Sequence, residues 1–275
     1  MIRGDFHVHT RFCDGACTPE EMVRAALDRG MNAIGFSGHS RTAFDESWCM
    51  SRAGTAAYRA EIARLKQKYA GRIAVYCGVE YDLRSVLDLS EFDYVIGSLH
   101  ATVTPAGAFD TDNTAELARE GIERCFAGDA DAAAESYFAQ YRAMAENPEI
   151  DVVGHFDLLT KFDEQGRLYD DSSPRYLEAA HDAMRLLAAA DKIFEINSGA
   201  MSRGYRTSPY PAKHLLEYLH QLGGRICLNS DAHSAKGVGY AFGQCLALAK
   251  ECGFTALWFL TERGFSPVSF HEIEL

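Results

Sequence analysis

The sequence has no cluster of basic residues and no long apolar segment. It contains 275 residues, of which 27 are Lys or Arg and 39 are Asp or Glu, and its formal net charge is -12. Nonspecific binding to a nucleic-acid backbone needs a basic surface, so we expect no nucleic-acid partner. The apolar stretches are far shorter than the ~20 residues that a membrane-spanning helix needs. No basic segment followed by an apolar one opens the chain, so we expect a cytoplasmic protein with no membrane contact.

The sequence also lacks paired cysteine motifs, low-complexity segments, internal repeats and Pro/Gly-rich linkers. Its eight cysteines are scattered, and the closest pair, Cys13 and Cys17, has no matching second pair. This spacing argues against a structural zinc ribbon and against a disulfide framework, and it favours reduced thiols. Without a linker to divide the chain, we expect one domain over residues 1–275.

Short apolar runs alternate with helical patterns along the chain. The segment after the first run carries start and stop signals for a helix, with Thr18 as N-cap, Pro19 at the first position, Glu21 completing a capping box and Gly30 at the end. We expect strands at 2–9, 32–40, 72–82, 92–101, 151–158, 192–199, 225–233 and 255–260. We expect helices at 52–70, 113–147 with a break near Gly128, 174–190, 209–222 and 239–252, and an irregular insertion at 102–135. Seven or eight strand–helix units predict a parallel α/β barrel.

Metal-type side chains gather at the ends of these expected strands. Six of the ten histidines lie at or just beyond a C-terminal strand end, namely His7, His9, His39, His100, His155 and His233. Glu80 and Asp231 occupy equivalent positions. The C-terminal strand ends of a parallel barrel meet at one face, where active sites form. Imidazole and carboxylate ligands together suit zinc, manganese or iron, and eight ligands exceed the needs of one tetrahedral ion. We therefore expect two or three divalent transition metals.

The alternative is that these histidines are ordinary buried residues. A single histidine in a strand is more often a hydrogen-bonded core residue than a ligand. Burying eight such groups without partners would cost roughly 1–3 kcal/mol each, which favours the metal interpretation. For the other four histidines we expect structural roles; these are His181, His214, His220 and His271.

Seven short motifs follow one another in a familiar order. They are "DFHVHTRFCDG", "GFSGHS", "GVEYD", "YVIGSLH", "VVGHFDL", "EINSGA" and "NSDAH". Because its motifs come in this order, the chain resembles the polymerase and histidinol phosphatase (PHP) family. Within that family it resembles the histidinol-phosphate phosphatases. The resemblance implies a single-domain, TIM-barrel-like, distorted (β/α)7 barrel with a trinuclear metal centre. It implies a first ion on His7, His9, Glu80 and Asp231, and a second on Glu80, His100 and His155. It implies a third ion on His39 and His233, which could share Asp231 with the first.

The same resemblance implies an activity. We expect a metal-dependent phosphomonoesterase of histidine biosynthesis that hydrolyses L-histidinol phosphate to L-histidinol and phosphate. A metal-bridging hydroxide would attack the ester, since clustered ions neutralise phosphate and lower the pKa of bound water. Glu80, Asp231 and His233 are the expected catalytic residues, and either Asp231 or a water is a candidate to protonate the leaving group.

Substrate contacts are expected from loops at the same face. Arginine matches the geometry of phosphate oxygens, and Arg203 and Arg206 follow the strand at 192–199. Lys161 follows the "GHFDLLT" segment, and family members often carry arginine at a position near this lysine. Asp14 is a candidate to bind a substrate amine or to stabilise a turn beside Gly15. Asp5 is expected either to orient the histidine pair through an imidazole N–H or to be solvated at the strand start.

Two other classes of function fit parts of the pattern. The first is a related hydrolase, acting on another small phosphate ester or a nucleotide, or an amidohydrolase. Amidohydrolases usually place a metal-bridging lysine where this chain has Glu80, which favours the phosphatase. The second is a noncatalytic metal-binding module of a larger assembly, for which a degraded ligand set would be expected.

Overall fold

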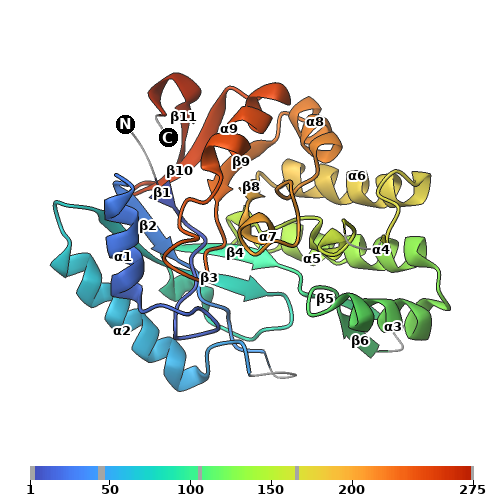
Figure 1. Ribbon diagram of the computed structural model, residues 1–275, viewed down its shortest axis with the longest axis horizontal. Coiled ribbons are helices and arrows are strands. Elements are labelled where there is room, and N and C mark those ends of the chain that lie inside the picture. The colour runs from blue at the N-terminus through green and yellow to red at the C-terminus, as the bar shows by residue number, and fades with distance from the viewer. Residues whose placement is uncertain (1–3, 43–46, 105–106, 165–166, 274–275) are drawn as a thin grey trace.

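Seven parallel strands form the central sheet of the computed structural model, which describes residues 4–42, 47–104, 107–164 and 167–273 (Figure 1). Their order in the sheet follows the chain: β1 (Gly4–Asp5), β2 (Ala33–Phe36), β3 (Ala74–Asp82), β4 (Tyr94–Ser98), β7 (Val152–Val153), β8 (Ile193–Asn197) and β9 (Arg225–Asn229). Each neighbouring pair is parallel. Residues 2 and 3 of the first expected strand lie outside the described residues.

The segments that follow the first and last strands close this sheet into a barrel. The backbone N–H of His9 donates to the carbonyl of Ala232 over 2.9 Å, and the N–H of Ala232 donates to the carbonyl of His7 over 3.0 Å. The expected seven-stranded, distorted barrel is therefore confirmed. Its closure brings the loop after β1 against the loop after β9, although the two are more than 200 residues apart in the sequence.

The expected strand at 255–260 exists but does not join the barrel. It forms β10 (Ala256–Thr261), which pairs antiparallel with β11 (Gly264–Ser269) in a separate hairpin. A tight turn ends at Gly264, which has a φ of 93° that favours glycine. The hairpin packs on the barrel through Phe259, whose ring centroid lies 6.2 Å from that of Phe6. The alternation of strands and helices left open whether the barrel has seven or eight strands. The prediction of an eighth strand is wrong for the described residues, in which the barrel has seven.

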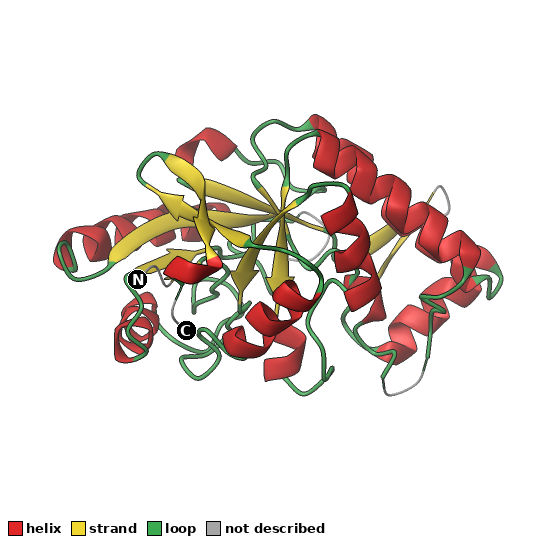
Figure 2. Ribbon diagram, turned by 90° about the horizontal axis from the view of Figure 1, so that it is seen from above, coloured by secondary structure: helices red, strands yellow, loops and turns green. Residues whose placement is uncertain are grey.

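Helices surround the barrel (Figure 2). They are α1 (Pro19–Asp28), α2 (Arg52–Lys68), α6 (Pro174–Ala189), α8 (Lys213–Gln221) and α9 (Phe242–Glu251), with the short α7 (Gly199–Ser202) next to β8. The predicted capping box of α1 is confirmed, because Thr18 and Glu21 each accept a hydrogen bond from the other's backbone N–H. Among the described residues, no helix is both long and apolar enough to cross a membrane.

The insertion is more regular than we expected. The segment predicted at 102–135 contains most of the hairpin of β5 (Ala101–Thr104) and β6 (Gly107–Asp110), then α3 (Ala115–Phe126) and the start of α4 (Ala130–Ala139), on the right in Figure 1. α5 (Tyr141–Glu146) follows it. Residues 105 and 106 lie outside the described residues. The break expected near Gly128 is confirmed, because this glycine has a φ of 83° between two helices. Arg175 of α6 forms ion pairs with Asp129 and Glu135, which hold the insertion against the barrel.

A tyrosine fills the barrel interior. Tyr94 is 1% exposed, and its hydroxyl donates to the backbone carbonyls of Phe6 and Phe36. A Cβ atom at Gly35 or Gly78 would lie 2.5 Å or less from this side chain. These two glycines are therefore needed for the phenol ring to pack between the strands.

Candidate metal centre

The eight predicted ligands meet at the C-terminal end of the barrel. His7 and His9 follow β1, His39 follows β2, Glu80 lies in β3, His100 follows β4, His155 follows β7, and Asp231 and His233 follow β9. Most of them are buried, and His7 and His9 are both 0% exposed. Residues distant in the sequence thus form one polar cluster, as the strand-end pattern predicts.

Glu80 lies at the centre of this cluster. Its carboxylate is 1% exposed and contacts five imidazoles. The nitrogen–oxygen distances are 2.8 Å to His39, 2.9 Å to His155, 3.2 Å to His100, 3.3 Å to His7 and 3.4 Å to His9. Burial raises the pKa of Glu80, but the surrounding imidazoles outweigh it and hold that pKa well below its usual value.

Several atoms of the cluster have no hydrogen-bond partner among the described residues. Nε2 of His7, Nε2 of His9 and Oε2 of Glu80 are buried and make no hydrogen bond of good geometry, although they lie in ion-pair contact with one another. Oδ1 of Asp231 lies 3.8 Å from Nε2 of His7 and 3.3 Å from Nε2 of His9. Leaving a buried polar atom unsatisfied costs about 1–3 kcal/mol. Two imidazoles and two carboxylates turned toward one another fit a divalent transition metal, which would satisfy these atoms together.

The donor atoms fall into four overlapping groups, within each of which the atoms lie within 4.8 Å of one another. The groups are His7, Glu80 and His155; His7, His9 and Asp231; His39, Glu80 and His100; and His9, Asp14, His39 and His233. Glu80 belongs to two of them, which agrees with the bridging position that the family resemblance implies.

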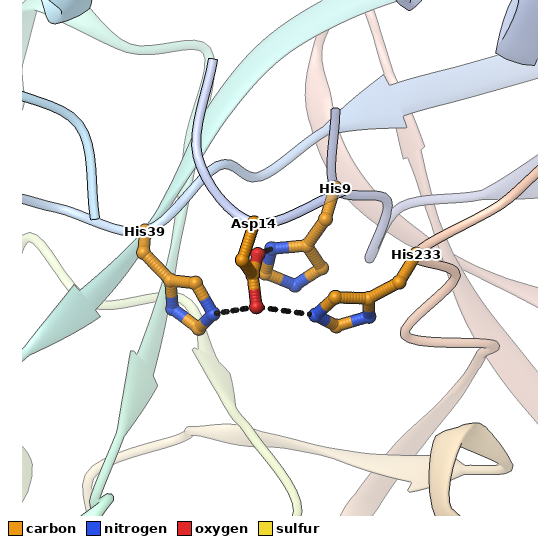
Figure 3. A group of neighbouring side chains, drawn as sticks. All are labelled: His9, Asp14, His39 and His233. Carbon is orange, nitrogen blue, oxygen red and sulfur yellow. Dashed lines mark hydrogen bonds and ion pairs between the residues drawn. The ribbon is translucent and has the colours of Figure 1, made fainter. Parts of the chain in front are cut away.

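Asp14 belongs to the fourth group, where the sequence did not place it. Figure 3 shows its carboxylate between His39 and His233, with His9 beside it. Its Oδ2 lies 2.9 Å from Nε2 of His233 and 3.6 Å from Nε2 of His39. A Cβ atom on Gly15 would lie 2.5 Å from the backbone N of Thr10, so this glycine allows the loop to fold back tightly. An acidic residue beside a glycine, four residues after the end of "HVHT", is the signal that could have identified it.

Asp231 is held in an unusual backbone conformation. Its φ is 50°, in the left-handed region, which non-glycine residues adopt mainly at turns and functional sites. Nη2 of Arg203 lies 3.0 Å from Oδ2 of Asp231, and Nη1 of Arg203 donates to its backbone carbonyl. Burial raises the pKa of Asp231, but Arg203 and His7 hold it well below the usual value.

The electrostatics of the cluster favour cations. Burial lowers the pKa of His7, but Glu195, Glu80 and Asp231 more than offset this and raise it to about 10. Burial likewise lowers the pKa of His100, while Glu80 and Asp82 raise it to about 9. The carboxylates therefore stabilise positive charge among these imidazoles, whether protons or metal ions supply it.

A cavity of about 390 Å³ opens onto the cluster. Three of the predicted substrate residues line it, namely Asp14, Arg203 and Lys161. Nζ of Lys161 donates to the backbone carbonyl of Asp112 over 2.6 Å and lies 4.9 Å from the ring centroid of Tyr205. A larger cavity of about 640 Å³ adjoins α2, β3 and β10, and none of the predicted site residues lines it.

Arg206 does not line the cavity that contains Arg203 and Lys161. Its guanidinium donates to the backbone carbonyl and hydroxyl of Thr160 and lies 4.6 Å from the ring centroid of Tyr210. The structure thus gives Arg206 a packing role between two loops and provides no support for a substrate contact.

The four remaining histidines lie outside the cluster, as expected. His181 stacks on Tyr218 with ring centroids 3.7 Å apart, and His220 packs against Phe254. Neither they nor His214 and His271 belong to any metal-type group of the described residues.

Asp5 does not orient the imidazoles of the histidine pair. Its carboxylate accepts hydrogen bonds from the backbone N–H groups of Ser230 and Gly239, and from that of His7 over 3.4 Å. It therefore connects β1 to the loop after β9. The carboxylate that contacts Nδ1 of His7 belongs to Glu195, 2.9 Å away, a residue that we did not predict to lie at the site. A carboxylate in the middle of the otherwise uncharged run "IFEINSG" was the available signal.

Comparisons with known proteins identify relatives of this chain. The PHP domain profile matches residues 5–199. A protein of Deinococcus radiodurans named probable histidinol-phosphatase is 32% identical over 260 residues, which cover 90% of this chain and 93% of the relative. The histidinol-phosphatase of Bacillus subtilis is 25% identical over 267 residues, covering 88% of this chain and 97% of that protein.

A solved structure shares the fold. The crystal structure of histidinol phosphate phosphatase from Lactococcus lactis, complexed with zinc, L-histidinol and phosphate, superposes with a TM-score of 0.73. It is 23% identical, and the match covers 96% of this chain and 98% of the other. The profile match, the Deinococcus relative and the strand-end cluster together lead to one conclusion. This chain belongs to the PHP domain family.

Proposed function

We propose that this chain is a metal-dependent phosphomonoesterase that hydrolyses L-histidinol phosphate to L-histidinol and phosphate. The observation that carries the proposal is the buried set of unpartnered imidazole and carboxylate atoms beneath a cavity lined by Arg203 and Lys161. The names of the Deinococcus and Bacillus relatives support the same activity.

We assign zinc, manganese or iron to the cluster, with two or three ions. His7, His9, Glu80 and Asp231 would hold the first ion, and Glu80, His100 and His155 the second. His39 and His233 would hold the third, and the position of Asp14 between them supports adding it to this set. Divalent ions at these positions would supply Lewis acidity, neutralising phosphate oxygens and lowering the pKa of water.

The protein's own cations would bind and orient the phosphate. Arg203 offers a planar set of donors that matches phosphate oxygens, and it already lies against Asp231 at the cavity edge. Lys161 adds a second positive charge in the same cavity. Glu80, Asp231 and His233 also line the cavity, so they would lie close to the ester, and Glu80, which is 1% exposed, would join the ligand sets.

The cavity also has an acidic side that favours a cationic alcohol. Asp110, the last residue of β6, and Asp112, which follows β6, both line the cavity. Carboxylates beside a phosphate site favour an ester whose organic part carries positive charge, as the ammonium group of histidinol does. This feature favours histidinol phosphate over a nucleotide, which brings no such charge.

A substrate panel tests this proposal. The metal-loaded protein should hydrolyse L-histidinol phosphate with a kcat/KM at least about tenfold above those for p-nitrophenyl phosphate and adenosine monophosphate. Asp112→Asn should raise KM for histidinol phosphate more than KM for p-nitrophenyl phosphate, because the ion pair of Asp112 with Lys161 affects the phosphate of both esters and the loss of the carboxylate affects only the cationic one. Equal kcat/KM values for all three esters would contradict the assigned substrate, and no hydrolysis of any ester would contradict the phosphatase.

A further inference from the structure

The segment "EINSGA", which begins in β8, has no place in the ligand set described above. β8 lies between β7 and β9 in the sheet, and its Glu195 is 0% exposed. A buried carboxylate in the middle of an apolar strand is costly unless it is fully hydrogen-bonded. Its partners therefore indicate why the sequence places it there.

Both oxygens of Glu195 are saturated by donors. Nδ1 of His7 lies 2.9 Å from Oε2 and 3.1 Å from Oε1. The side-chain amides of Asn197 and Asn229 donate to Oε1 and Oε2 over 2.7 Å and 2.8 Å. These amides hold the carboxylate in one orientation, directed at the imidazole of His7.

The contact with His7 determines which ring nitrogen is available. A neutral imidazole that donates from Nδ1 to a carboxylate presents its lone pair at Nε2, so a metal ion would take the place of the Nε2 proton and leave the Nδ1 proton in its hydrogen bond to Glu195. Nε2 of His7 is the atom that lacks a hydrogen-bond partner and lies 3.3 Å from Glu80. Glu195 thus fixes both the tautomer and the orientation of the ring.

The same carboxylate also holds His155. The backbone N–H of His155 donates to Oε1 of Glu195 over 2.8 Å. The imidazole of His155 then reaches Glu80, with its Nε2 2.9 Å from Oε1. One side chain therefore positions two ligand-type histidines that follow different strands, β1 and β7.

We propose that Glu195 is a positioning residue of the metal centre, which aligns His7 and His155 for metal binding without contacting the ion. The proposal rests on the metal centre of the proposed function. Residues that orient a metal-bound histidine typically contribute about 10–100-fold to metal affinity.

Zinc titration of the folded chain tests this role independently of catalysis. Metal-stripped Glu195→Gln and wild-type protein are titrated with zinc against a chromophoric chelator, and circular dichroism checks their folding. We expect about 10–100-fold weaker zinc binding for Glu195→Gln. Asp151→Asn is the matched control, because Asp151 accepts a backbone hydrogen bond from Val95 and contacts no ligand-type residue. It should bind zinc like the wild type.

Equal zinc affinities for Glu195→Gln and wild type would overturn the proposal while leaving the phosphatase intact. A wild-type chain that binds no zinc, manganese or iron would overturn both. If Glu195→Gln does not fold, Glu195→Asp provides the same test, because the shorter side chain keeps the charge and loses the contact with His7. Nitrogen NMR of histidine-labelled protein adds a second readout, in which the Nδ1–H signal of His7 should change only in the Glu195 variants.

Discussion

Replacing Glu80 with Gln removes the carboxylate that five imidazoles share in the centre of the cluster. The substitution keeps the shape of the side chain and removes its negative charge. Because Glu80 belongs to two of the four metal-type groups, we expect the loss of more than one ion.

The size of the effect follows from the burial of this carboxylate. Glu80 is only 1% exposed, so solvent screens its interactions little. Removing one partner from a buried charged contact typically costs about 3–5 kcal/mol. At about 1.4 kcal/mol per tenfold change, this corresponds to about two to four orders of magnitude in metal affinity.

Elemental analysis after dialysis, with kcat measured on the same samples, provides the assay. The Glu80→Gln protein should retain less than half of the wild-type metal and lose nearly all phosphatase activity. Glu178→Gln, on the exposed face of α6, is the control and should match the wild type. A Glu80→Gln protein with wild-type metal content and kcat would refute the central position of this carboxylate.

Three further predictions follow from single residues. Asp14→Asn should lower the metal content by about one equivalent without changing the fold, and an unchanged content by elemental analysis would contradict its place among the ligands. A Cβ atom at Gly199 would lie 2.5 Å from Oδ2 of Asp231, so Gly199→Ala should displace this carboxylate and reduce kcat at least about tenfold; wild-type kcat would contradict this. Burial raises the pKa of Asp163 from 3.8 to about 6, so the folded state binds this proton more tightly and loses stability as pH rises through this range. In urea unfolding, the free energy of unfolding of Asp163→Asn should therefore rise by about 1–2 kcal/mol relative to that of the wild type between about pH 4 and pH 7. A difference in unfolding free energy that does not change with pH would contradict the raised pKa.

The ligand cluster could be predicted from the sequence because two independent regularities coincide there. Each strand is a local apolar pattern, and the topology of a parallel barrel brings all C-terminal strand ends to one face. Residues as distant as His7 and His233 could therefore be placed together without any knowledge of their contacts. The helix that begins at Thr18 was predictable for a similar reason, since its capping box is a local signal.

Other features depend on contacts that sequence patterns do not encode. Strand β10 has the same apolar composition as a barrel strand, yet it pairs antiparallel with β11 across the turn that ends at Gly264. Arg203 and Arg206 lie in one loop, and residue type alone does not reveal that Arg206 turns toward Thr160. Asp14 reaches the histidines only because the loop folds back at Gly15.

The two acidic residues near the histidine pair illustrate the same limit on sequence patterns. Asp5 is closer to His7 in the sequence, yet it accepts hydrogen bonds from backbone groups, including those of Ser230 and Gly239. Glu195 contacts the imidazole of His7 from a strand 188 residues away. Strand order in the closed barrel, rather than sequence proximity, determines which carboxylate reaches the ring.

Phosphate release from L-histidinol phosphate is the most direct test of the proposed metal-dependent phosphatase. The purified protein is assayed as isolated, after removal of metal by a chelator, and after addition of zinc or manganese. For this phosphatase we expect phosphate release by the isolated protein, loss of at least about 99% of that release after chelation, and recovery when metal is restored. Undiminished release from metal-stripped protein, or no release from metal-loaded protein, would contradict the proposed function.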